Sequence, residues 1–117
     1  MHMIRPAALA LCTLLSGAAA ARADAPTPCG PRVTAAYSSL AEGNWRYLYL
    51  IELVAHRAME VRVTLQLPQT AARWPNGAAI NMHPGMTIRH PFAEGVLRHY
   101  SPAEMQAYTT LMCRDLG

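Results

Sequence analysis

The chain has 117 residues, of which 52% are hydrophobic and 15% are charged, a composition typical of one small globular domain. Its 10 basic residues are all arginines, and because Arg5 and Arg22 lie in the first 23 positions, the remaining eight face seven acidic residues, a net charge of +1. So small a charge argues against nucleic acid or acidic lipid as an electrostatically recognised partner.

Residues 1–23 predict a signal peptide for export. One charge at Arg5 precedes an apolar run from Ala7 to Ala21, and Ala21-Arg22-Ala23 places small residues where a signal peptidase cuts. The run is shorter than the roughly 20 apolar residues of a membrane span, so we expect cleavage after Ala23 and no membrane span in the mature protein. The absence of lysine and the many alanines indicate a GC-rich genome and hence a bacterium. We therefore expect a periplasmic or secreted protein.

Cys29 and Cys113 both lie beyond the signal, and an even pair of cysteines in an exported domain predicts a disulfide. Two buried free thiols are the alternative. A bond would close almost the whole domain into one loop and contribute about 4–5 kcal/mol. Residues 24–31 predict a Pro-rich, extended leader that becomes ordered where Cys29 is bonded, and residues 32–117 predict a single domain.

The first strong structural signal in chain order lies at residues 45–54, with weaker strand character at 33–40, ended by 41–44. Aromatic and aliphatic side chains occupy both faces of 45–54, so a buried helix is an alternative. The aromatic enrichment favours a strand, and residues 55–58 then predict a tight hairpin to the next one. The face of this strand that carries Trp45, Tyr47 and Tyr49 is expected to be buried.

Residues 59–67 alternate strictly between apolar and polar side chains. Met59, Val61, Val63, Leu65 and Leu67 are expected in the core, and the even-numbered positions between them are expected to face water.

Prolines recur every seven to eleven residues from Pro68 to Pro102, which excludes an ordinary helix between Leu67 and Ser101. Short strands at 78–82, 86–90 and 96–100 fit, with His83-Pro84-Gly85 as the turn between the first two. Ser101-Pro102-Ala103-Glu104 is a capping box. It predicts one helical turn, then a strand from about 107 to 113, although residues 105–113 also fit a helix.

Together these elements predict an all-β fold. Six or seven short strands with frequent turns in about 90 residues, and one helical turn near Ser101, favour an immunoglobulin-like β-sandwich.

Two methionines and two histidines gather in the segment that contains the predicted turn: Met82, His83, Met86 and His90. Thioether and imidazole ligands suit copper outside the cytoplasm, and a hairpin would bring Met82 near Met86. Methionine also fills core gaps. The residues therefore define a candidate copper site, while the main expectation is a protein without a cofactor.

No catalytic motif accompanies these residues: there is no Cys-x-x-Cys, no phosphate-binding glycine loop and no His-Glu-x-x-His. A buried Glu52 would need a partner such as Arg46 or Arg62. Trp74, flanked by Arg73 in the 68–77 loop, is expected to be partly exposed and to contact a partner. The leading hypothesis is a non-enzymatic, exported module that binds an envelope protein through its sheet edges or this loop. A copper protein and an enzyme with an unfamiliar site are the alternatives.

Overall fold

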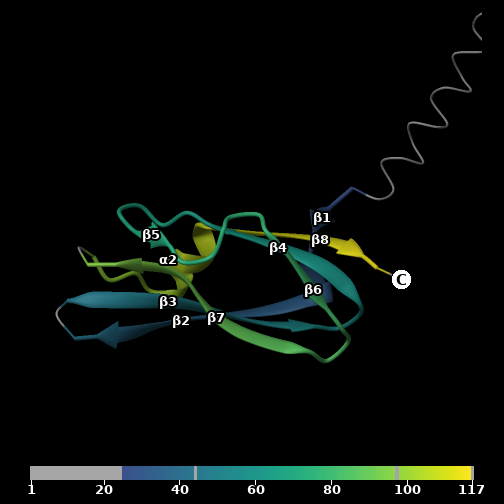
Figure 1. Cartoon of the computed structure of the whole chain (residues 1–117), viewed down its shortest axis with the longest axis horizontal. Coiled ribbons are helices and arrows are strands. Elements are labelled where there is room, and N and C mark those ends of the chain that lie inside the picture. Colours follow the sequence, from purple (N-terminus) through teal and green to yellow (C-terminus); the bar gives the residue numbers. More distant parts are fainter. Residues whose placement is uncertain (1–24, 44, 97, 117) are drawn as a thin grey trace, which may run out of the picture.

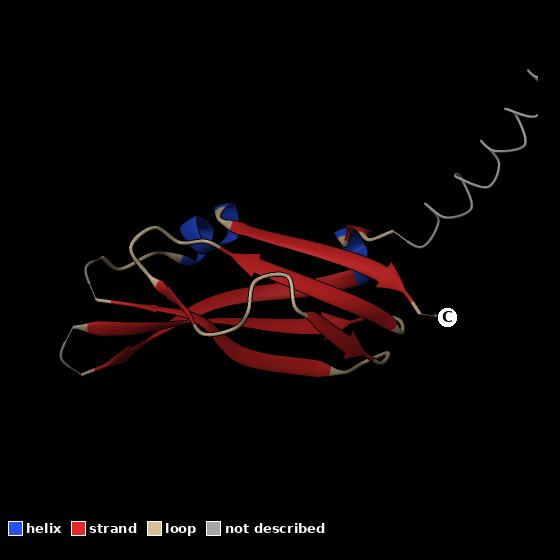
Figure 2. Cartoon of the chain, turned by 45° about the horizontal axis from the view of Figure 1, so that its top comes forward, coloured by secondary structure: helices blue, strands red, loops and turns tan. Residues whose placement is uncertain are grey.

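The computed structural model describes residues 25–43, 45–96 and 98–116, and two four-stranded antiparallel sheets form a β-sandwich there (Figures 1 and 2). The predicted signal, residues 1–23, lies outside the described residues. In order, the first sheet contains β1 (Thr27–Pro28), β8 (Thr109–Asp115), β4 (Met59–Leu65) and β6 (Ala79–Met82). The second contains β2 (Val33–Glu42), β3 (Arg46–Ala55), β7 (Thr87–Gly95) and β5 (Ala71–Ala72). The all-β prediction is confirmed.

The core lies between the sheets, and strand periodicity selects its residues. Met59, Val61, Val63, Leu65 and Leu67 are all buried, as the alternation predicts. Residues 46–55 form a strand and not a helix, and Tyr49, Ile51 and Leu53 on its inner face are fully buried. β3 and β4 are thus the central strands of the core.

Glu60 corrects the expectation that even-numbered positions of β4 face water. Its side chain is buried because β4 lies between β8 and β6, and two arginines close over it. Arg62 Nε donates to Glu60 Oε1 over 3.1 Å, and Arg114 Nη2 donates to Oε2 over 3.0 Å. Hydrogen bonds from Arg114 and then from Arg62 hold the pKa of Glu60 below its usual value, against desolvation by burial. The buried charge is fully paired.

Both expected tight hairpins are wrong, because the chain changes sheet at each of them. Residues 56–58 lead from β3 in the second sheet to β4 in the first, and residues 83–86 lead from β6 back to β7. The Gly85 N–H donates to the Ala55 carbonyl over 2.8 Å, so the two crossings pack together. Three extended residues span about 10 Å, which is also the spacing of packed sheets. A short connection can therefore form a hairpin within one sheet or a crossing between two sheets.

β7 runs through Pro91, beyond the predicted end of that strand at residue 90. Leu50 pairs with Pro91 and Tyr49 with Ala93, which leaves Phe92 as the extra residue of a β-bulge. A bulge tolerates a proline, which has no N–H for the ladder. The strand predicted at 96–100 is absent from the described residues there: β7 ends at Gly95, and an irregular connection follows.

The capping box is confirmed, and it begins α2 (Pro102–Ala107). The Glu104 N–H donates to Ser101 Oγ over 3.1 Å, and the Ser101 N–H donates to Glu104 Oε1 over 2.9 Å. Glu104 also pairs with Arg98. β8 follows the helix at Thr109, close to the predicted start, and runs two residues beyond the predicted end at Cys113.

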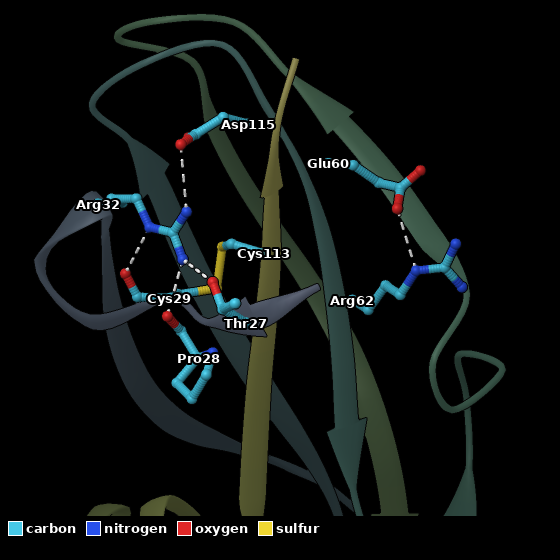
Figure 3. The surroundings of a disulfide bond; sticks show 8 residues. All are labelled: Thr27, Pro28, Cys29, Arg32, Glu60, Arg62, Cys113 and Asp115. Atoms are coloured by element: carbon cyan, nitrogen blue, oxygen red, sulfur yellow. Dashed lines mark hydrogen bonds and ion pairs between the residues drawn. A yellow bond between two sulfur atoms is a disulfide. The ribbon is translucent and has the colours of Figure 1, made fainter. Parts of the chain in front are cut away.

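The predicted disulfide joins Cys29 to Cys113, 84 positions apart, with Cα atoms 4.8 Å from each other (Figure 3). Part of the leader is more ordered than expected, since β1 pairs with β8 and a 3₁₀ turn covers Gly30–Arg32. Arg32 donates to the carbonyls of Cys29 and Pro28 and lies 3.4 Å from Asp115 at the end of β8. The arginine therefore supports the same junction as the disulfide.

Candidate functional site

β2 is a ten-residue strand at the edge of the second sheet, and among the described residues it pairs only with β3. The His56 N–H donates to the Arg32 carbonyl over 3.0 Å, which fixes that pair as hydrogen-bonded. Along an antiparallel ladder, hydrogen-bonded pairs alternate with pairs that form no hydrogen bond to each other. The odd-numbered residues of β2 therefore direct their backbone N–H and C=O groups away from β3; these are Val33, Ala35, Tyr37, Ser39 and Ala41.

These outward groups form no backbone hydrogen bond with any other described segment. Helix α2 lies against β2 but does not pair with its backbone. Two described side chains of β2 contact the residues that flank α2 in the chain. Ser39 Oγ lies 2.8 Å from His99 Nε2, and the Tyr37 side chain forms a hydrogen bond with Thr109. Burial raises the pKa of Tyr37 more than this bond lowers it. The backbone groups along this edge are therefore unpaired within the part of the chain that the structure describes.

Sheet edges of this kind are normally protected by shortness, charge or proline, because a free edge templates pairing with another chain. The other edge strands described are protected: β1 and β5 have two residues each and β6 has four. The half of β7 that β5 leaves uncovered carries Arg89 and Pro91. β2 has no proline and no charge before Glu42, and helix α2, which lies against it, leaves its outward backbone groups without a backbone partner among the described residues.

Trp45, at the turn between β2 and β3, is 85% exposed and has a φ of 68°. Sequence analysis placed it on the buried face of β3, and that expectation is wrong. A left-handed backbone costs a non-glycine residue about 1–2 kcal/mol. Trp45 forms no hydrogen bond or ring contact with any described residue, so nothing in this part of the domain offsets the strain.

Two further exposed aliphatic side chains lie at the same end of the second sheet, which Figure 1 shows at the left, where β2 and β7 end. Leu40 is 51% exposed near the end of β2, and Val96 is 53% exposed just after β7. The term "apolar tip" below means Leu40, Trp45 and Val96. Leu40 and Trp45 lie at the end of the free edge, and Val96 lies on the other side of β3.

The four residues of the candidate copper site do not share one surface. Met82 is on β6 and completely buried in the core, whereas His83 and Met86 are exposed in the crossing to the other sheet. His90 is on β7 and half-buried, with Nδ1 2.7 Å from the Pro91 carbonyl oxygen. Among the described residues, no three His, Cys, Asp or Glu side chains are grouped to hold a metal.

His90 lies against Trp74 instead, so residues from two separately predicted sites meet. Their ring centroids are 4.8 Å apart at 73°, and Phe92 lies 5.8 Å from Trp74. Trp74 is half-buried, as expected, and packs against the core; its indole Nε1 is buried without a hydrogen-bond partner among the described residues. Arg73 is more exposed and pairs with Glu94 at 2.5 Å.

That ion pair belongs to a cluster on the outer surface of the second sheet. Arg46 also lies 3.3 Å from Glu94 and 3.6 Å from Glu42. The hydrogen bond from Arg73 is the main reason that the pKa of Glu94 lies below its usual value. Arg46 is therefore not the partner of Glu52 that the sequence suggested, and Arg62 pairs with Glu60.

Ser39 and His99 are the closest approach to a catalytic arrangement. The ring of His99 packs 4.5 Å from that of Tyr47, and no described carboxylate bonds to the imidazole. Asp115 pairs with Arg32 and Arg57, near the disulfide junction. A serine nucleophile needs a base that a third group orients, and this pair has no such group among the described residues.

Comparison with known proteins gives no relative: no family model, no curated protein and no solved structure matches the chain. No described helix has the length and apolar character needed to cross a membrane. The function of this chain must therefore be inferred from its own geometry.

Sequence analysis missed the free edge of β2 and the exposure of Trp45. The sequence does contain a signal for the free edge of β2, because residues 33–41 have neither a charge nor a proline. That signal becomes meaningful only once β2 is known to be an edge strand, and this depends on the pairing of distant segments.

Proposed function

We propose that this chain is an exported, non-enzymatic binding module of the bacterial envelope, which takes an extended segment of a partner protein along the free edge of β2. The unpaired ladder edge of this ten-residue strand is the observation that carries the proposal. A strand added to a sheet edge gains affinity from backbone hydrogen bonds and specificity from alternate side chains.

The side chains of β2 suit a close approach by another strand. Thr34, Ala36 and Ser38 on the outer face are small, so an added strand meets little steric hindrance. Ala35 and Tyr37 on the inner face are half-buried against the core. Apolar side chains of the partner would extend the core beyond them, so we expect a segment with apolar residues at alternate positions on its inner face.

Export is the second part of the proposal, and two features support it. The disulfide is typical of an oxidising compartment outside the cytoplasm, and the sequence of residues 1–23 has the pattern of a secretory signal.

We also propose an immunoglobulin-like topology for the sandwich. The order β2-β3-β7-β5 corresponds to strands A-B-E-D of that fold, and the pair β4-β8 corresponds to C-F. Two features differ: β1, from the N-terminal side, lies where strand G would pair with F, and β5 precedes β6 in the chain. A fold does not by itself define a function. The free edge of β2, and not the sandwich topology, therefore supports the proposed binding role.

Amide hydrogen exchange tests the proposed function directly. Random linear peptides would be selected by display against the purified, disulfide-bonded domain, and a selected peptide would be titrated while exchange is followed residue by residue. We expect new protection at Ala35, Tyr37 and Ser39, whose N–H groups point outward, and little change at Ala36 and Ser38, which already bond to β3. Protection confined to other segments would contradict the proposal.

A matched pair of variants separates edge pairing from general damage. Ala35→Pro removes an outward N–H that no described group uses, and edge strands tolerate proline there. Ala35→Ser keeps the N–H and the small size. We expect Ala35→Pro to abolish peptide binding and Ala35→Ser to preserve it, with both variants folded by circular dichroism. Equal affinities would contradict the edge mode.

A further inference from the structure

We propose that Trp45 is the anchor residue for the partner segment, contacting the portion of it that runs past the end of β2. This inference rests on the proposed function, because it assumes that an extended polypeptide lies along β2. It also states which residue of this chain contributes most of the affinity, namely Trp45. The partner segment must then carry an apolar side chain beyond the part that pairs with β2.

Trp45 has a left-handed backbone conformation in the turn between β2 and β3. Glycine or asparagine normally occupies a left-handed position in a turn, because a Cβ atom there meets the backbone. Here the largest side chain occupies it, is 85% exposed and contacts no described ring or hydrogen-bonding group. Strained backbone positions cluster at functional sites. Exposed tryptophan is also the residue type most often found as an interface hot spot.

Trp45 lies at the end of the free edge of β2. Glu42, the last residue of β2, pairs in register with Arg46, so Trp45 is in the turn that closes this end of the strand. A segment that follows β2 to its end passes Leu40 and reaches the turn that carries Trp45, whereas Val96 follows β7 on the far side of β3. Edge and anchor are therefore continuous.

The charges around the tip favour a polypeptide over a lipid surface. Glu42 and Glu94 lie next to Arg46 and are paired with it, so the surroundings have no excess of positive charge. An interfacial membrane anchor usually combines apolar side chains with a basic surface that attracts anionic lipid. The tip offers apolar groups within a neutral ion-pair network, which suits a protein partner.

The test compares Trp45→Gly with Trp45→Phe, using the displayed-library peptide described above. Glycine removes the backbone strain, so we expect Trp45→Gly to melt at or above the wild-type temperature and yet to bind roughly tenfold or more weakly. Trp45→Phe keeps an aromatic ring and should retain most of the affinity. A purely structural role for Trp45 cannot give higher stability together with weaker binding.

Fluorescence supplies an independent readout, because the chain has two tryptophans. In a Trp74→Phe background, emission comes from Trp45 alone and should shift to the blue when the peptide binds. The same protein would be mixed with vesicles of phosphatidylethanolamine and phosphatidylglycerol. A blue shift with vesicles and none with peptide would overturn the proposal in favour of a lipid surface.

The outcomes distinguish this inference from the proposed function. Protected β2 amides with unchanged affinity in Trp45→Gly would overturn the anchor and leave the edge mode intact. A blue shift of Trp45 without protection of β2 would overturn the edge mode and with it the continuity on which the anchor is argued. Failure to obtain any peptide that binds the wild-type domain would overturn both.

Discussion

Tyr49 and Tyr100 meet edge to face in the core, with ring centroids 5.8 Å apart, and the Tyr49 hydroxyl accepts a hydrogen bond from the Tyr100 backbone N–H over 3.1 Å. The same hydroxyl donates to the Arg98 carbonyl over 2.8 Å. One side chain on β3 therefore satisfies two backbone groups of the irregular connection between β7 and α2. Burial raises the pKa of Tyr49 above its usual value, so the hydroxyl stays protonated and able to donate.

Tyr49→Phe should therefore destabilise the domain by about 1–3 kcal/mol, because it leaves a buried N–H and a carbonyl without their partner. Chemical denaturation followed by circular dichroism measures the change. Tyr108→Phe is the matched control, since Tyr108 is exposed and its ring contact with Tyr100 survives the substitution. A loss in the control as large as in Tyr49→Phe would contradict this assignment.

Glu60 should make the free energy of unfolding depend on pH in the acidic range. Arg114 first and Arg62 second lower the pKa of its carboxyl in the folded state. A carboxyl whose pKa is lower in the folded than in the unfolded state stabilises the fold at any pH above its unfolded-state pKa. That stabilisation is lost as the pH falls through its folded-state pKa. Glu60→Gln should therefore melt below the wild type at about pH 7, and the difference should shrink toward about pH 3. Thermal melts across that range measure it, and a constant difference would show that charge is not the cause.

The disulfide should contribute about 4–5 kcal/mol, because it restricts a loop that spans most of the domain in the unfolded chain. The double variant Cys29→Ala and Cys113→Ala should lose this amount in urea denaturation. Both cysteines are buried, so reductant should open the bond slowly in native buffer and rapidly in denaturant. Equal reduction rates in the two conditions would contradict this burial.

Trp74→Ala separates a packing role from a binding role. The indole packs against His90 and Phe92 and is half-buried, so its loss should destabilise the domain by about 1–3 kcal/mol, less than a fully buried tryptophan. The sequence also predicts Arg73 and Trp74 as partner contacts. If they serve that role, Trp74→Ala and Arg73→Ala should each weaken binding of the selected peptide. An unchanged affinity in both variants would limit Trp74 to packing.

Copper titration tests the Met/His prediction. Because Met82 is buried in the core, and His83 and Met86 lie in the crossing while His90 is half-buried on β7, we expect no Cu(I) or Cu(II) affinity tighter than about micromolar. Isothermal titration of the disulfide-bonded domain measures it. Tighter binding that Met86→Leu or His90→Ala abolishes would restore the copper site, and Met82→Leu would show whether the core opens to supply a ligand.

Local patterns predicted the features that depend on a residue's immediate neighbours. The alternation from Met59 to Leu67 identified the inner face of β4, and Ser101 and Glu104 identified the start of α2. For Cys29 and Cys113, removal of the predicted signal together with Cys12 leaves two cysteines, which allow one pairing. These are consequences of strand periodicity, helix capping and compartment, which need no knowledge of the fold.

Only the tertiary structure decided which strands are neighbours. The same three residues, 56–58, fit a hairpin or a crossing between sheets, and the crossing places β3 and β4 in different layers. That choice buries Glu60, separates Met82 from His90, brings His90 to Trp74 and leaves β2 at an edge. Each of these depends on contacts between segments far apart in the chain. Their free energy comes from the whole packed core, so no short stretch of sequence encodes them.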